Sequence, residues 1–159
     1  MNLETLSLQE REDLSLAASM ECFRRLQELA RWADPEDEPV QRILRSLALN
    51  QDRRIEKLEQ SGARLKSPRP PRHRPEDLRR LIREHFPSLT RPLGEGIVGR
   101  EEAMHLAGCL EEESALFDRL MANLSSPDRP KAPLLDLERL GDSFLGLLRS
   151  VLMAGTDRP

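Results

Sequence analysis

The sequence predicts an all-α protein, and three of its features lead to that expectation. Its 159 residues include four Phe, one Trp and no Tyr, whereas β-sheets are enriched in aromatic side chains. Apolar residues return every three or four positions over long stretches, which is the period of a helix with one buried face. Segments that contain proline and glycine separate these stretches. The length suits a single domain, 1–159, that can bury a core without disulfides or metals.

The first predicted helix begins at a cap near Ser7 and runs to about Ala33. Glu10 follows Ser7 by three residues, which is the spacing of a capping box. The expected buried face of this helix carries Leu16, Met20, Phe23, Leu26 or Gln27, and Ala30. The acidic turn at residues 34–39 then starts a second helix, Pro39 to about Gln60, because proline is tolerated in a first turn. The short connection predicts that these two helices pack antiparallel.

The second half of the chain predicts another helix pair after a long connection. A segment rich in proline and arginine, followed by a short helix from Pro75 to about Phe86, makes residues 62–98 an extended crossover. The third long helix, Gly99 to Leu124, is expected to bury Met104, Ala107, Leu110 or Glu111, Ser114, Phe117, Met121 and Leu124. A last helix is predicted from Leu134 to about Met153. Two pairs joined by a long crossover have the connectivity of a ferritin-like four-helix bundle.

Polar residues on the predicted inner faces raise the question of a site. Gln51 and Arg54 lie on the inner face of the second helix, and Glu111 lies on that of the third. A carboxylate inside a bundle must be paired, protonated or bound to a metal. Glu112 and Glu113, which follow Glu111, are expected in solvent.

A family resemblance bears on these positions. Residues Ala107, Glu111, Ser114, Phe117, Asp118 and Ala122 stand at the spacings of the pattern AxxxExxAxxFYxxLA. In this respect the third helix resembles the corresponding helix of the rubrerythrin branch of the ferritin-like superfamily. The resemblance implies a di-iron site with one Glu on each of helices one and three, and a Glu-x-x-His on each of helices two and four.

The resemblance also implies which residues stand at the former ligand positions. They are Ser19 or Glu21 on helix one, Gln51 and Arg54 on helix two, Glu111 on helix three, and Phe144 and Leu147 on helix four. Only Glu111 clearly keeps a ligand, whereas a di-iron centre needs several carboxylates and imidazoles. We therefore expect no cofactor and no catalytic residue, with iron as the alternative if the ligand alignment is wrong. In place of metal, Arg54 is expected to contact Glu111, helped by Gln51.

Other motifs lack the context that their chemistry requires. Residues 94–99 match GxGxxG but follow no predicted strand, so a hinge is favoured over a dinucleotide site. His105 shares a helix face with Glu101 and Glu112, where a mononuclear metal site is the alternative to a solvated charged face. The cysteines, Cys22 and Cys109, lie within predicted helices and far from any CxxC partner, which favours reduced thiols.

Charge and hydropathy limit the partners and the location. A net charge of −3 gives no general attraction to nucleic acid or anionic membranes, and the basic crossover lacks interleaved aromatic residues. No apolar run approaches the length of a membrane span or of a secretion signal, so we expect a cytoplasmic protein. The last helix is apolar beyond one stripe, which predicts a homodimer.

These observations favour a non-enzymatic ferritin-like protein with a degenerate di-iron site, in a structural or interaction role with an unknown protein partner. Neither nucleic acid nor membrane is expected to be a partner. The alternative is a rubrerythrin-type oxidoreductase or iron-handling protein whose ligands are aligned differently. The two differ in whether the purified protein carries iron.

Overall fold

The computed structural model describes residues 6–64 and 73–125, and all of the regular elements in these ranges are helices. They are α1 (Leu8–Trp32), α2 (Glu38–Arg64), α3 (Pro75–His85), α4 (Pro87–Thr90) and α5 (Arg100–Ser125). The all-α prediction is confirmed. The predicted last helix, Leu134–Met153, lies outside the described residues.

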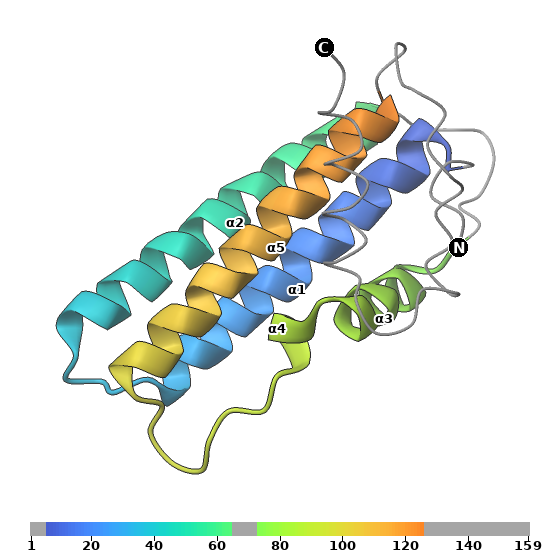
Figure 1. Cartoon of the computed structure of the whole chain (residues 1–159). Helices are drawn as coiled ribbons and strands as arrows, with labels where there is room; N and C mark the ends of the chain where they lie inside the picture. The colour runs from blue at the N-terminus through green and yellow to red at the C-terminus, as the bar shows by residue number, and fades with distance from the viewer. Residues whose placement is uncertain (1–5, 65–72, 126–159) are drawn as a thin grey trace, which may run out of the picture.

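The three long helices, α1, α2 and α5, lie side by side and form the body of the structure (Figure 1). A short turn joins α1 to α2, and these two helices run antiparallel as expected (Figure 1). The helix α5 runs parallel to α2, because α3, α4 and the loop after them lead the chain back along the body before α5 begins (Figure 1). A long connection allows this parallel arrangement, whereas a tight hairpin would make α2 and α5 antiparallel.

Local signals set several of the helix ends. At the start of α1, the Ser7 side chain accepts a hydrogen bond from the Glu10 backbone N–H at 3.2 Å, and the Glu10 carboxylate accepts one from the Ser7 N–H at 2.9 Å. The predicted capping box is thus confirmed. The helix α1 ends at Trp32, and Ala33 is extended. The helix α2 continues to Arg64, past its predicted end.

The core lies where α1, α2 and α5 meet, and α3 and α4 cover one side of it. Its largest fully buried side chains are Phe86, Phe117, Leu14, Leu26, Leu29, Leu44, Ile82, Leu89, Leu106, Leu110 and Leu120. Phe86, between α3 and α4, meets Phe117 of α5 edge to face, with ring centroids 5.7 Å apart. This pair joins the crossover to the body of the structure.

The buried face of α1 differs from the predicted stripe. Met20 and Phe23 are only half buried, whereas Leu14, Cys22 and Leu29 are buried almost completely. The reason is that α1 contacts each of the other four described helices, so more than one of its sides is covered. Within 6–64 and 73–125, no helix combines the length and the apolarity that a membrane crossing requires.

Candidate functional site

The polar side chains between α2 and α5 form one hydrogen-bonded network. Arg54 of α2 donates from Nη1 to the Ser114 hydroxyl at 3.2 Å, and its Nη2 is hydrogen-bonded to the Asp118 carboxylate. Gln51, one helical turn before Arg54, donates from Nε2 to the same hydroxyl at 3.4 Å. Burial lowers the pKa of the Arg54 guanidinium. Two positions of α2 and two of α5 are thereby linked in a network that runs from buried Gln51 and Ser114 to the partly exposed Arg54 and Asp118.

The predicted ion pair between Arg54 and Glu111 is wrong, because Arg54 pairs with a different carboxylate. The ion pair is made with Asp118, which lies two helical turns after Glu111. Because α2 and α5 run parallel, their contacts keep a nearly constant offset in sequence, which places Arg54 beside Ser114 and Asp118. Glu111 is half buried and close enough to raise the pKa of Arg54, opposing the effect of burial. Its Oε1 is buried without a hydrogen-bond partner among the described residues.

These residues do not fit a di-iron centre. Gln51 and Arg54 stand where the resemblance implies a carboxylate and an imidazole, and a guanidinium has no lone pair to offer a metal. Ser19, at the expected position on α1, is buried, but it is not a carboxylate. In the described ranges, no group of three or more His, Cys, Asp or Glu side chains could hold a metal ion. The positions on helix four, Phe144 and Leu147, lie outside the described residues.

The second candidate on α1, Glu21, is an ion-pair centre. Its carboxylate is completely buried and accepts hydrogen bonds from Arg79 Nε of α3 at 2.9 Å and from Arg24 Nε at 3.1 Å. Arg83 Nη1 of α3 lies 3.7 Å away. Glu21 therefore fixes α3 on α1, and its oxygens already accept from arginines, whose positive charges oppose a metal cation at the same carboxylate.

The buried carboxylate that the sequence analysis missed is Glu113, which was expected in solvent. It is 1% exposed, and its Oε1 accepts from the Ser88 hydroxyl at 2.7 Å and from the Ser88 backbone N–H at 3.3 Å. Burial raises the pKa of Glu113. Its position could have been found from the spacing, because Leu110 precedes it by three residues and Phe117 follows it by four, on the same buried face.

We expect the stability of a Glu113→Gln variant, relative to the wild type, to rise with pH. Folding raises the pKa of Glu113, chiefly through burial, so the folded protein holds this proton more tightly than the unfolded chain does. The stabilisation linked to that proton is complete below the unfolded pKa and is lost as the pH rises through the folded pKa. Gln keeps an acceptor for Ser88 and does not titrate.

Urea unfolding of both proteins at about pH 3 and about pH 7, on either side of the usual range for Glu, measures this difference. The matched control is Glu101→Gln, at an exposed position of the same helix, which should change the pH dependence less. A difference between Glu113→Gln and the wild type that is the same at both pH values would contradict the expectation.

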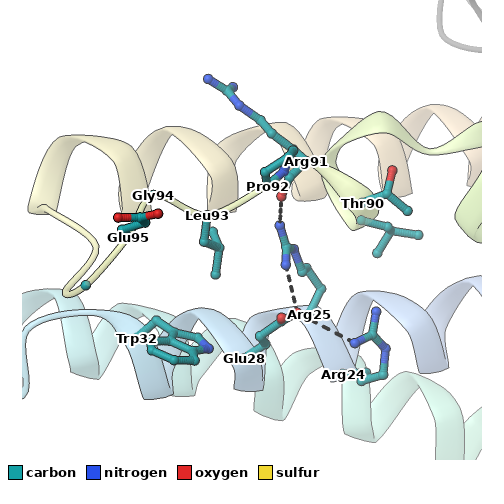
Figure 2. A pocket seen from close by; sticks show the side chains of 12 residues that line it. Arg24, Arg25, Glu28, Trp32, Thr90, Arg91, Pro92, Leu93, Gly94 and Glu95 are labelled. Atoms are coloured by element: carbon teal, nitrogen blue, oxygen red, sulfur yellow. Dashed lines mark hydrogen bonds and ion pairs between the residues drawn. The ribbon is translucent and has the colours of Figure 1, made fainter.

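An open cleft of about 670 Å³ lies beside the second half of α1 (Figure 2). Arg24, Glu28 and Trp32 stand along its α1 side, and residues 89–96 form the opposite side (Figure 2). Trp32 is 52% exposed, although it is the only tryptophan of the chain. The cleft thus combines an aromatic side chain, apolar surface and charges of both signs.

A buried arginine holds the two sides of this cleft together. Arg25 is 4% exposed, donates from Nε to the Ser88 carbonyl at 3.2 Å and is hydrogen-bonded from Nη2 to the Arg91 carbonyl. Its Nη1 also bonds to the Glu28 carboxylate at 2.7 Å (Figure 2). Glu113 accepts from the Ser88 N–H near the start of α4. Arg25 donates to the carbonyl of Arg91, the residue that follows the end of α4.

The loop before α5 closes the end of the cleft. The Val98 N–H donates to the Trp32 carbonyl at 2.8 Å, and Ala33 and Val98 form an isolated parallel bridge. Gly96 has a φ of 90°, a conformation that glycine adopts without steric cost. Residues 94–99 therefore carry their glycines in a loop tied to the end of α1, and the dinucleotide reading has no strand to support it in the described chain.

Comparison with known proteins identifies no relative, since no family model, curated protein or solved structure matches this chain. The resemblance to rubrerythrins therefore stays an expectation that rests on the spacing of residues 107–122.

Proposed function

We propose that this protein is a non-enzymatic, rubrerythrin-like member of the ferritin-like proteins, with a structural or interaction role. The observation that carries the proposal is the guanidinium of Arg54 between α2 and α5, held by Ser114 and Asp118. An arginine there supplies a fixed positive charge and several hydrogen-bond donors, two of which bond to Ser114 and Asp118, in the region where the resemblance implies a metal.

Among the described residues, the buried thiol and the buried Glu21 carboxylate offer little reactive chemistry beside this network. Cys22 is buried, and burial, with Glu113 as the largest charge contribution, raises the pKa of its thiol to about 12. The thiol is therefore protonated at neutral pH, whereas nucleophilic and redox reactions of cysteine require the thiolate. The Glu21 carboxylate forms ion pairs with Arg79 and Arg24, as described above.

An interaction role is supported by the apolar side chains exposed at the end of α1. Trp32 is 52% exposed and Ile97 is 68% exposed. The backbone bond between Trp32 and Val98 holds these two side chains in the same region. Tryptophan and arginine are enriched among the residues that dominate binding energy at protein interfaces. The predicted dimer contact through the apolar last helix lies outside the described residues and stays a prediction.

One observation favours the alternative of an iron-binding protein. Three side-chain oxygens, Gln51 Oε1, Glu111 Oε1 and Glu113 Oε2, are buried without a hydrogen-bond partner within residues 6–64 and 73–125. Oxygen atoms of this kind are suitable ligands for hard cations. The alternative requires further ligands from the rest of the chain.

Metal analysis decides between the two. The untagged protein, expressed aerobically in iron-rich medium, is expected to contain far less than one iron per chain. A matched variant that carries Gln51→Glu together with Arg54→His restores two ligand types of the family and should hold more iron than the wild type. That gain would support Arg54 as the group that keeps iron out. Two irons per wild-type chain would contradict the proposal and support the iron-binding alternative.

A further inference from the structure

A histidine and a cysteine lie together on the outer side of α5, apart from both the interior network and the cleft. His105 is exposed and Cys109 is half buried, one helical turn further along. The Cys109 sulfur lies 3.8 Å from His105 Nε2. The helical spacing places His105 on one face with Glu101 and Glu112, and in the structure the Cys109 thiol lies beside the imidazole.

The separation of these two atoms is close to that of two ligands on one zinc ion. With Zn–S bonds of about 2.3 Å, Zn–N bonds of about 2.0–2.1 Å and tetrahedral angles, sulfur and nitrogen lie about 3.6 Å apart. Both side chains project from the same rigid helix at positions i and i+4, which face the same side. The pair can therefore bind one ion with little rearrangement.

One chain supplies only half of such a site. A structural zinc site has four protein ligands, and the described residues hold no group of three His, Cys, Asp or Glu side chains suited to a metal. A second copy of the same helix, related by two-fold symmetry, would add one His and one Cys and complete a Cys₂His₂ set.

Two further features of this face of α5 favour the approach of a second copy of the helix when a cation is present. Gly108 is exposed in the middle of α5, and a Cβ at this position would meet nothing within 4 Å. Glycine weakens a helix interior, but it lets another backbone come close. Glu101 and Glu112, both exposed, give the same face a negative charge. Two copies would therefore repel each other until a divalent cation offsets the charge.

We propose that His105 and Cys109 form half of a zinc site, which a second copy of this chain completes. The zinc ion binds the neutral imidazole of His105 through Nε2 and the thiolate of Cys109, and each thiol releases its proton on binding. The interior network takes no part, so this proposal goes beyond the proposed function and stands or falls separately from it. It gives the chain a zinc-dependent self-association.

Cobalt titration of the full-length, untagged protein, kept reduced with a non-thiol reductant, tests the proposal. We expect saturation at one Co²⁺ per two chains, visible absorption of a tetrahedral ion and a thiolate-to-cobalt charge-transfer band in the ultraviolet, both removed by Zn²⁺. Sedimentation with Zn²⁺ should show at least a doubling of the mass found with chelator. Absence of binding, or one metal per chain without a change in mass, would overturn the proposal.

Variants on and off this face complete the test. Cys109→Ser and His105→Gln should each lose the cobalt spectrum and the zinc-dependent gain in mass. Cys22→Ser, at the buried thiol, and His85→Gln, on α3, should keep both, and loss of the spectrum in these controls would place the ligands elsewhere and refute the assignment. Gly108→Leu has open space to fold and should abolish the gain in mass. Association of Gly108→Leu at the wild-type level would also overturn the proposal.

Discussion

An Arg25→Leu variant is expected to lose about 3 kcal/mol of unfolding free energy, as for other buried charged groups whose partners are left behind. The Arg25 side chain is 5% exposed and bonds to two backbone carbonyls, of Ser88 and Arg91, and to the Glu28 carboxylate. Leucine fills part of the volume but leaves all three acceptors without this donor. Urea unfolding followed by circular dichroism measures the loss.

The neighbouring arginine provides the matched control. The Arg24 side chain is 43% exposed, and its carboxylate partner Glu21 keeps Arg79 and Arg83 when Arg24 is removed. Glu28, the second carboxylate near Arg24, likewise keeps Arg25. Because Arg24 is itself largely in water and leaves no buried charge without a partner, Arg24→Leu should cost about 1 kcal/mol or less. Equal losses in the two variants would show that the bonds of Arg25 across the cleft do not stabilise the fold more than a surface arginine does.

A Phe117→Ala variant should lose about 3–5 kcal/mol, the usual range for truncating a buried phenylalanine. Phe117 is fully buried on α5, and its ring packs edge to face with the ring of Phe86. The substitution removes apolar area, leaves a cavity and removes the ring contact with Phe86 of the crossover. The same unfolding measurement applies, with the half-buried Phe23→Ala as the control. A loss in Phe117→Ala no larger than in Phe23→Ala would contradict the central place of this contact.

The parts of the fold that could be predicted are those with local causes. Ser7 and Glu10 define the start of α1 through bonds within one helical turn, and the proline at position 75 marks the start of α3. The apolar spacing also placed most of the buried face of α5, from Ala107 to Leu124. These signals depend on residues a few positions apart, so they can be recognised without knowledge of the tertiary structure.

The remaining features depend on contacts between distant segments. Arg25 is polar and would normally be placed in solvent, but α4 and the residues after it bring carbonyl groups to its side chain. Glu113 is buried because Ser88 supplies its donors. The partner of Arg54 depends on the register between α2 and α5, which the length of the crossover does not specify. Each of these needs a partner more than 20 positions away, which helical periodicity does not report.

The single tryptophan has a practical consequence for studies of this protein in solution. Trp32 ends α1, borders the cleft and is hydrogen-bonded through its carbonyl to Val98 of the loop before α5. Because no second tryptophan contributes to its emission, its fluorescence reports on this one region. Circular dichroism, in contrast, averages over all helices. Comparing the two signals along a denaturant series therefore separates release of the loop at the cleft from unfolding of the helical body, with no added label.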